Sequence, residues 1–526
     1  MIDLIIKKPQ NIKNDILAGI TVALALVPEA IAFSFVAHVD PKIGLYAAFL
    51  MGLITAIFGG RPGMISGATG AVAVIFAPLV IVQTALHGSA VALNYLFLAV
   101  SLMGVFQFLF GAFKLGKFIR LIPHPVMLGF VNGLAIIILK AQFSQFYVGT
   151  GDAARLMDIV PLGIMIGLIA LTMAIIHYLP KLTKAVPATL VAIVTVSVLT
   201  IYLKSLGLEI YTVLDFVKNM DPTKTTLAAA LPKFKVPFFS WHALKVVWHY
   251  SLLAACVGLI ESLMTLTLVD ELTDTRGRGN KESMAQGLAN LLNGFFGGMG
   301  GCAMIGQSMI NVRAGGRFRL SGITASLSLL VFFLFGSVLI EAIPLAALVG
   351  VMFMVAIATF EWSSLRILKQ IPPSDAFVIF IVSATTVFVD LAVAVFVGLI
   401  LSALTFAWKQ GKKITADTSI NEHGNKTYNL HGGLFFGSVY SFKELFDFKN
   451  DPTDIYIDFE YARVYDHSGL EALQNVANRY GQAGKTLHLL NLSRECRDLL
   501  DKAENIVEIS IIETLKWHHL AEDRLA

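Results

Sequence analysis

Two stretches of this 526-residue chain combine an isolated glutamate with a glycine-rich segment, and both lie among apolar residues. The first is VALALVPEAIAF (Val22–Phe33), followed after one apolar stretch by GGRPGMISGATGAVAVIF (Gly59–Phe76). The second is AACVGLIESLMT (Ala254–Thr265), followed in the same way by GGMGGCAMIGQSMINV (Gly297–Val312). A glutamate inside an apolar helix is expensive to bury and therefore suggests a functional site. The matched pairs predict an internal repeat whose two halves both contribute to that site.

The glycines suggest what kind of site this is. Because glycine disfavours a helix, each segment is predicted to run extended into a short helix that begins inside the membrane. The first N–H groups of that helix, and the positive end of its dipole, would then face a cavity. Two such half-helices from opposite sides would direct both positive ends at one point, which is a site for an anion. Glycines that merely allow close helix packing are the alternative, and the matched glutamates favour the site.

The two glutamates have different neighbours. Glu261 has Thr265 one turn away on the same helix face. A carboxylate and a hydroxyl at this spacing can hold Na⁺, or the carboxylate can carry a proton. Glu29 could belong to the anion site. Alternatively, it could be protonated and form a hydrogen bond with a purely structural role.

The elements that must position these residues are membrane helices. Hydrophobic residues make up 56% of the chain and charged residues only 14%, whereas about 25% of a soluble domain is charged. No short apolar run followed by a cleavage site begins the chain, so we expect no removable signal peptide. The cysteines Cys256, Cys302 and Cys496 are too few and too scattered for a disulfide framework or a structural metal site. Stretches that approach or reach the roughly 20 residues needed to cross a bilayer are Ile16–Ala37, Leu162–Ile176, Ala185–Tyr202, Leu320–Ile340 and Leu391–Trp408.

Clusters of lysine and arginine predict the topology, because short cytoplasmic loops are enriched in these residues. Two spans between successive clusters fit every interval, which predicts about fourteen transmembrane segments with both termini in the cytoplasm. The basic loop from Lys204 to Lys245 would lie outside, and long loops follow the charge rule poorly. The fold class is therefore an α-helical polytopic protein of the cell (inner) membrane. The clusters are Lys7/Lys8/Lys13, Arg61, Lys114/Lys117/Arg120, Lys181/Lys184, Arg276/Arg278/Lys281, Arg313/Arg317/Arg319, Arg366/Lys369 and Lys409/Lys412/Lys413.

After Trp408 the sequence becomes polar and charged. Its patterns predict a small α/β domain over 410–526, behind a transmembrane domain over 1–409. The two repeats of the transmembrane domain would cover about 12–204 and about 246–409. In the small domain we expect strands at Thr427–Leu434, Asp454–Phe459 and Thr486–Leu490, and helices at Gly469–Tyr480 and Ile512–Leu520.

Three of these segments resemble one known family. VPEAIAFSFVAHVDPKIGLYAAF (Val27–Phe49) is similar to the first-helix motif of the sulfate permease (SulP) family of anion transporters, kin of solute carrier family 26. NVRAGGRFRLSGI (Asn311–Ile323) resembles the stretch after that family's second half-helix. The C-terminal domain resembles the STAS module, named for sulfate transporters and anti-sigma-factor antagonists. The resemblance covers nearly the whole chain and implies two inverted repeats of seven segments, a core and a gate domain, elevator-like movement and a homodimer.

The resemblance also implies the site residues. The anion would lie between the third and tenth segments, and Glu261 and Thr265 fall where sodium-coupled bicarbonate transporters of the family bind their cation. No cofactor is expected beyond the coupling ion, Na⁺ or H⁺. Many relatives have Gln at the position of Glu29 and Arg at that of Gln307, so this site is less electropositive than the family norm and favours cation-coupled symport. The implied substrate-binding residues are Glu29, Phe33, Thr69, Gly70, Ala71, Gly306, Gln307 and Ser308.

The C-terminal domain contains one candidate regulatory residue. VYDHSGLEAL (Val464–Leu473) resembles the turn that carries a phosphorylatable serine in anti-sigma-factor antagonists, and Ser468 lies at that position. A helix N-cap formed among Asp466, His467 and Ser468 is the alternative, and we favour it. We expect the domain to stabilise a dimer or to bind a cytosolic protein.

The leading interpretation is a secondary active transporter and not an enzyme. Its partners would be the lipid bilayer and a small inorganic or organic anion (sulfate, bicarbonate or a dicarboxylate), with no nucleic acid. An uncoupled anion channel or exchanger is the alternative. The related purine and pyrimidine permeases share the fold, but the STAS tail disfavours them. A membrane-anchored enzyme or receptor lacks support, since the sequence shows no nucleotide-binding loop, metal-ligand cluster or nucleophile–base set.

Overall fold

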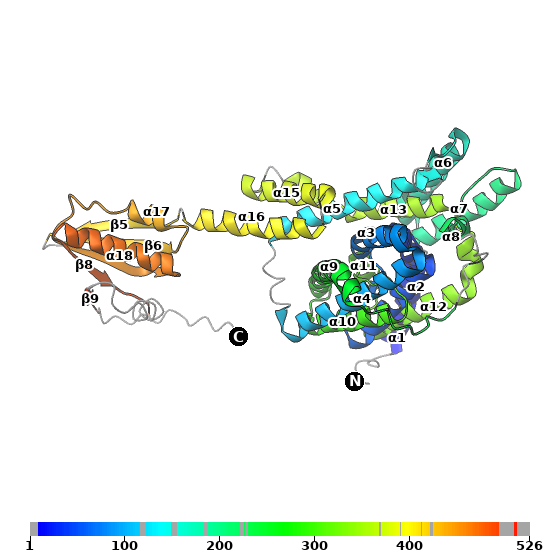
Figure 1. Ribbon diagram of the computed structural model, residues 1–526, viewed down its shortest axis with the longest axis horizontal. Helices are drawn as coiled ribbons and strands as arrows, with labels where there is room; N and C mark the ends of the chain where they lie inside the picture. The colour runs from blue at the N-terminus through cyan, green and yellow to red at the C-terminus, as the bar shows by residue number, and fades with distance from the viewer. Residues whose placement is uncertain are drawn as a thin grey trace. The chain divides into compact units, whose positions relative to one another are not determined.

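The computed structural model describes most of the chain and divides it into two compact units, Met1–Gly398 and Leu399–Ala526. Both units are drawn in Figure 1, and each is described here by itself. The described residues are 9–115, 123–148, 155–183, 187–220, 226, 230–367, 370–389, 391–411, 413–420, 424–493 and 510–512.

The N-terminal unit is built of helices, since a helix satisfies its own backbone groups in an apolar surrounding. Four very short strands interrupt them: β1 (Ser66–Gly67), β2 (Tyr147–Val148), β3 (Arg155–Leu156) and β4 (Cys302–Ala303). The helices of the first half are α1 (Pro9–Val36), α2 (Pro41–Phe58), α3 (Gly70–His87), α4 (Ser89–Ala112), α5 (His124–Gln142), α6 (Ile159–Leu182), α7 (Ala188–Ser205) and α8 (Val213–Met220). Those of the second half are α9 (Trp241–Thr273), α10 (Gly279–Phe295), α11 (Ile305–Arg313), α12 (Arg319–Glu341), α13 (Leu345–Thr359), α14 (Trp362–Ile367) and α15 (Pro373–Phe388). Helix α16 (Leu391–Gly411) begins in this unit and ends in the next.

Ten helices of the described part of the chain are long and apolar enough to cross a membrane, and α15 is a shorter apolar helix. The fold class predicted from composition, an α-helical membrane protein, is confirmed. The count of about fourteen segments stays a prediction. Helices α10 and α11 are not among the ten, because α11 has only 9 residues and the 17-residue α10 carries a row of polar side chains.

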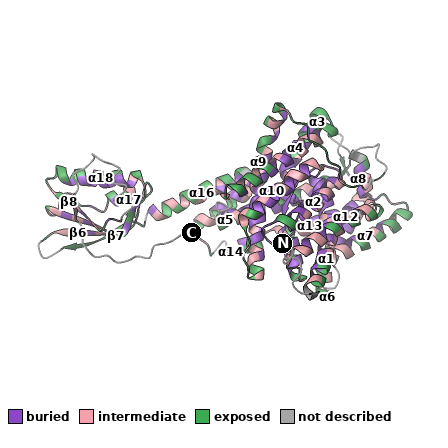
Figure 2. Cartoon of the chain, turned by 90° about the horizontal axis from the view of Figure 1, so that it is seen from below, coloured by how far each residue is buried: buried purple, intermediate pink, exposed green. Residues whose placement is uncertain are grey.

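The helices of this unit pack in two groups. The core group consists of α1–α4 and α9–α12, whose members contact one another extensively. In the flanking group α5 packs on α13 and α15, and α6 packs on α7 and α13. Figure 2 shows buried residues gathered in the core group, while α6 and α7 are largely intermediate or exposed. Exposed apolar side chains on the flanking helices are suited to contact lipid.

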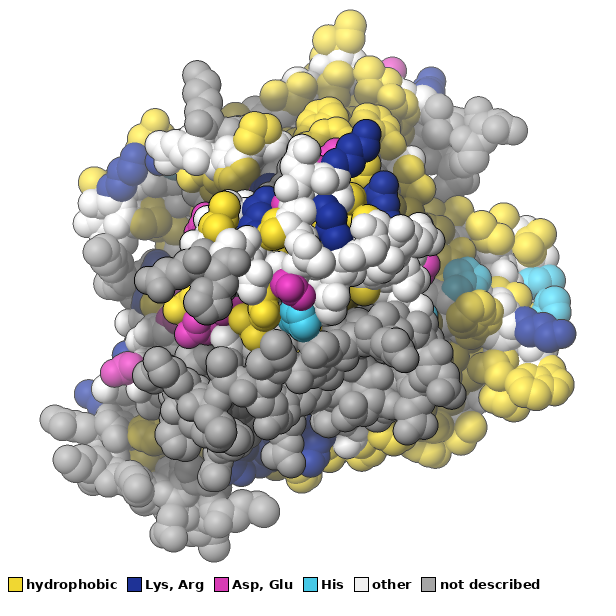
Figure 3. Space-filling view, turned by 90° about the vertical axis from the view of Figure 1, so that its left-hand side faces the viewer, with side chains coloured by type: hydrophobic (Ala, Val, Ile, Leu, Met, Phe, Trp, Pro, Cys, Tyr) yellow, Lys and Arg dark blue, Asp and Glu magenta, His cyan; other side chains and the backbone are white. Residues whose placement is uncertain are grey.

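The C-terminal unit is an α/β domain. Its five-stranded sheet has the order β5-β6-β7-β8-β9, in which β5 and β6 are antiparallel and the later neighbours are parallel. Helix α18 contributes Leu473, Val476 and Tyr480 to one hydrophobic core with Ile455 and Ile457 of β7. On the face that Figure 3 shows, side chains of both charges lie among apolar ones, which is typical of a surface in water. The elements are β5 (Thr415–Ile420), β6 (Lys426–Leu434), α17 (Val439–Lys443), β7 (Asp454–Val464), α18 (His467–Gln482), β8 (Thr486–Leu490) and β9 (Ser510–Ile512).

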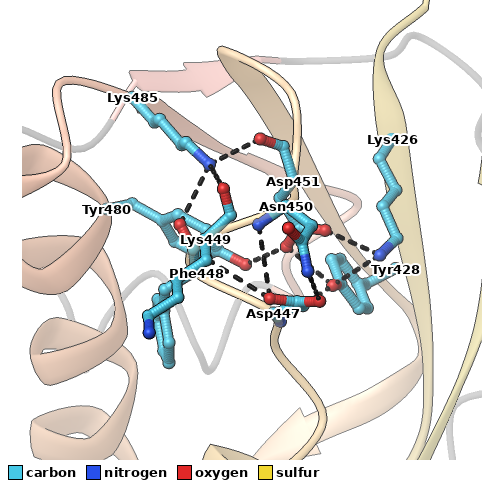
Figure 4. A network of polar contacts seen from close by, with 9 residues as sticks. All are labelled: Lys426, Tyr428, Asp447, Phe448, Lys449, Asn450, Asp451, Tyr480 and Lys485. Atoms are coloured by element: carbon cyan, nitrogen blue, oxygen red, sulfur yellow. Dashed lines mark hydrogen bonds and ion pairs between the residues drawn. The ribbon is translucent and has the colours of Figure 1, made fainter.

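A buried carboxylate fixes the loop between α17 and β7 (Figure 4). Asp451 accepts hydrogen bonds from Tyr428 (2.7 Å), Tyr480 (2.5 Å) and the ammonium group of Lys426 (2.7 Å). Lys485 adds bonds from its Nζ to the main-chain carbonyls of residues 448, 449 and 451. These bonds join the loop to β6, to α18 and to the start of β8.

The secondary structure expected for this domain is confirmed for β6, β7, β8 and α18, with β7 and α18 longer than expected. The helix expected at Ile512–Leu520 is not supported at its first residue, because Ile512 ends strand β9. The remainder of that range lies outside the described residues. Strand β5 was not expected.

Candidate functional site

The two glycine-rich segments meet in the structure. Strands β1 and β4 pair antiparallel, with Ser66 opposite Ala303 and Gly67 opposite Cys302. The approach is so close that a Cβ atom on Gly301 would lie 1.9 Å from the carbonyl oxygen of Gly67. Only glycine can occupy position 301 in this arrangement. The repeat inferred from sequence thus appears as two unwound segments that cross each other.

A helix follows each strand almost at once, and only the second of the two, α11, is short. Helix α3 begins at Gly70, with Thr69 as its N-cap residue, and α11 begins at Ile305 after Met304. The first three N–H groups of each helix have no acceptor inside that helix. Because β1 and β4 run antiparallel, α3 and α11 leave the ladder in opposite directions and both begin close to it, so their positive dipole ends face the region of the crossing.

Glu29 of α1 lies against the start of α11. Its Oε2 accepts a hydrogen bond from Nε2 of Gln307, which is only 5% exposed. This contact joins residues 278 positions apart in the chain. Phe33, one turn further along α1, lies next to Gly70, since a Cβ there would be 2.8 Å from its ring. Helices α1, α3 and α11 therefore meet in one place.

The other expected anion-site residues differ in accessibility. Gly306 is exposed, and a Cβ added to it would meet no atom within 4 Å, so open space lies beside the first turn of α11. Ala71 is buried. Ser308 has its hydroxyl engaged, because Oγ accepts from N of Ile65 (2.9 Å) and donates to the carbonyl of the same residue (3.3 Å). Its main-chain N–H donates to Met304. Ser308 therefore anchors the strand segment, and a direct role with the anion stays a prediction.

The expected cation-coupling residues, Glu261 and Thr265, lie on α9 next to β4. Oε2 of Glu261 accepts a hydrogen bond from the thiol of Cys302 over 2.7 Å. The hydroxyl of Thr265 donates to the main-chain carbonyl of Glu261 (2.8 Å), which leaves its oxygen lone pairs available. The same Cys302 sulfur lies 3.2 Å from Oγ1 of Thr69. Cys302 therefore connects Glu261 to the N-cap residue of α3, a role that no spacing in the sequence indicated.

The motif after the second half-helix caps α2. The guanidinium group of Arg319 donates to the carbonyls of Ala56, Ile57 and Gly59, which are left without helix partners at the end of α2. Asn311 donates to the carbonyl of Gly63. These bonds attach the glycine-rich loop of the first repeat to the second repeat.

In the C-terminal unit the N-cap of α18 is Asp466. Its Oδ1 accepts from N of Gly469 (2.8 Å) and its Oδ2 from N of Phe436 (2.9 Å). Ser468 lies in the first turn and is half-buried. The cap expected in this turn thus belongs to Asp466, and phosphorylation of Ser468 stays a prediction.

Comparisons with known proteins agree with this architecture. Residues 12–382 match the sequence profile of the Sulfate permease family, and residues 418–516 match that of the STAS domain. The chain is 42% identical over 495 residues to the putative sulfate transporter YbaR of Bacillus subtilis, covering 93% of this chain and 96% of that protein. It is 34% identical over 414 residues to the bicarbonate transporter BicA of a Picosynechococcus strain, covering 75% and 70% of the two chains.

A solved structure shows the same fold over both units. Murine Slc26a9, an anion transporter captured in the inward-facing state, superposes with a TM-score of 0.76 at 17% identity, over 94% of this chain and 88% of that one. The architecture and the sequence matches together define a polytopic membrane transport fold with a C-terminal STAS domain. The chain belongs to the sulfate permease family.

Proposed function

We propose that this chain is a secondary active transporter of small oxyanions or carboxylates, driven by symport of Na⁺ or H⁺. The observation that carries the proposal is the crossing of β1 and β4, from which α3 and α11 begin at opposite ends with their N-termini close to the crossing. Their unpaired N–H groups and dipoles favour an anion. Relatives named sulfate transporter and bicarbonate transporter make these two anions the first to test.

Coupling to a cation is supported by the charges around the site. Glu29 shares the region with the two helix ends and contacts Gln307, where an arginine would have supplied a full positive charge. A carboxylate at this place opposes anion binding unless a proton or another cation neutralises it. Glu261 and Thr265 supply two oxygen-bearing groups on one face of α9 for that cation. We propose no enzymatic activity for this chain.

The two helix groups support an elevator-like movement. Both half-helices, Glu29 and Glu261 belong to the core group, so the whole site could move as one body against the flanking group. We further propose a homodimer in the cell membrane with both termini and the STAS domain in the cytoplasm. The lysine and arginine clusters support this orientation. The domain boundary near residue 410 is supported by α16, which ends at Gly411.

The test is uptake into proteoliposomes of labelled sulfate, bicarbonate and fumarate, with Na⁺ and H⁺ gradients imposed separately. Accumulation of one anion that follows one gradient is expected. Anion flux that ignores both gradients would instead support an uncoupled exchanger or channel. Absence of flux for all three anions from a folded protein would overturn the proposal.

A further inference from the structure

Helix α10 carries a row of buried polar side chains that the proposed function does not yet use. Glu282, Gln286 and Asn290 recur every four residues, so they share one face of the helix. Their exposed fractions are 1%, 0% and 0%. On another face, a Cβ on Gly287 would lie 2.3 Å from the main-chain nitrogen of Phe108, which shows how closely α4 packs there. Helix α10 is therefore held closely against α4.

The polar row bonds to both glycine-rich segments. Oε2 of Glu282 accepts from N of Gly60 (2.7 Å), and Nε2 of Gln286 donates to the hydroxyl of Ser66 in β1 (2.8 Å). Asn290 bonds to the other segment, at Gly301, next to β4. Unwound backbone inside a membrane must find partners in the protein, and this row supplies some of them.

Asn290 makes the most specific of these contacts. Its Oδ1 accepts from N of Gly301 (2.9 Å), and its Nδ2 donates to the carbonyl of the same residue (2.9 Å). The amide thus pairs with the Gly301 peptide as a neighbouring strand would. Nδ2 also donates to Oε1 of Gln107 on α4 (2.8 Å), which fixes the orientation of the amide.

We infer that Asn290 is a positioning residue for the anion site. It holds the peptide of Gly301 at the point where the two segments cross, and Gly301 lies only five residues before the exposed Gly306 at the start of α11. Loss of both bonds frees β4 to shift, and a displacement of about 1 Å in a positioned group can cost roughly 100-fold in activity. The inference rests on the proposed anion site.

Asn293 provides a matched control on the same helix. It is also fully buried and also lies beside the glycine-rich segment, at Gly298. Within the described residues, however, neither its Nδ2 nor its Oδ1 has a hydrogen-bond partner. Replacement of an unpaired buried amide by an apolar side chain of the same shape is close to neutral or stabilising.

The experiment compares Asn290→Leu, Asn290→Asp and Asn293→Leu in the full-length chain. For each we would measure the unfolding midpoint, and the KM and maximal rate of uptake of the anion that the parent transports. We expect Asn290→Leu to raise KM about tenfold or more, while Asn293→Leu stays within about twofold of the parent. Asn290→Asp keeps the acceptor for N of Gly301 but places a carboxylate oxygen against the carbonyl of Gly301 and Oε1 of Gln107, so its KM should rise at least as much as that of Asn290→Leu.

Several outcomes would overturn the inference. One is a KM that is unchanged in Asn290→Leu, or that rises equally in Asn293→Leu. Another is that neither Asn290 variant folds although Asn293→Leu does, since Asn290 would then serve folding alone. A parent that moves none of the anions is a separate result, because it removes the proposed function itself.

Discussion

The thiol of Cys302 donates a hydrogen bond to Oε2 of Glu261, and its sulfur is also within 3.2 Å of the Thr69 hydroxyl. Thr69 makes no side-chain cap bond to α3, so its hydroxyl is directed to the sulfur instead. A cation that binds Glu261 competes for the oxygen that the thiol uses. The freed thiol can then donate to Thr69, which is a physical connection between the proposed cation and anion sites.

Replacement of Cys302 by alanine should therefore weaken coupling more than binding. We expect the anion KM of the parent to depend on the coupling cation by at least about fivefold, the lower end of usual coupling energies. In Cys302→Ala this dependence should shrink to less than about twofold, and Cys302→Ser should retain most of it. The measurement is uptake at low and at saturating cation. An alanine variant with the cation dependence of the parent would show that the thiol is not the connection.

Glu261→Gln should abolish gradient-driven uptake and leave the protein folded. The amide oxygen can still accept from Cys302, so the packing is preserved, but the side chain can neither bind Na⁺ as a carboxylate nor carry a proton. Size-exclusion profile and unfolding midpoint serve as controls for folding. Retained accumulation driven by the Na⁺ or H⁺ gradient would disprove the coupling role of Glu261.

Glu29→Gln should strengthen anion binding. The substitution removes a negative charge at the start of α11 while an amide can keep the contact with Gln307. Relief of about 1 kcal/mol of repulsion corresponds to a KM lower by roughly fivefold. Saturation curves for uptake at several pH values provide the measurement. A higher KM would mean that Glu29 helps to hold the substrate.

Alanine should destabilise the fold at Gly301 but not at Gly306. At Gly301 the added Cβ would lie 1.9 Å from the carbonyl of Gly67, a main-chain atom that cannot move without opening the crossing. At Gly306 the added Cβ meets open space. We expect Gly301→Ala to lower the unfolding midpoint and abolish uptake, and Gly306→Ala to keep the parental midpoint. Equal midpoints for the two variants would contradict the crossing geometry.

Asp451 makes the stability of the STAS domain depend on pH. Burial raises the pKa of its carboxyl, but hydrogen bonds from Lys426, Tyr480 and Tyr428 outweigh burial and hold the pKa below its ordinary value. A lowered pKa in the folded state contributes stability above the unfolded value near about 4, and this contribution is lost as the pH falls further. Asp451→Asn should lower the free energy of unfolding of the domain by about 1–3 kcal/mol at neutral pH. It should also weaken the loss of stability as the pH falls. Proteolysis of the C-terminal unit in the full-length chain, followed against pH, would measure both. A variant that keeps the acid sensitivity of the parent would refute the role of Asp451.

The sequence predicted the features that depend on local pattern. Apolar length predicted the membrane helices, and the glycines next to Gln307 predicted an interrupted helix. Contacts between distant segments could not be predicted in this way. The bond from Gln307 to Glu29 joins residues 278 positions apart. Nothing local distinguishes Asn290, whose side chain bonds to Gly301, from Asn293, whose side-chain amide has no partner among the described residues. Strand β5 was missed because its residues, Thr415–Ile420, are mostly exposed and show no apolar alternation.

The crossing of β1 and β4 also constrains how the protein is made. Thr69 and Cys302 meet although 233 residues separate them. A ribosome adds roughly 5–20 residues per second, so the first half-helix must wait in the bilayer for on the order of ten seconds or more before its partner strand exists. During that interval the main-chain groups of β1 have no strand to pair with, and an apolar surrounding penalises them. The first half of the chain therefore needs shelter at the insertion machinery until the second half arrives, and truncated products that end before Cys302 should be early targets of membrane quality control.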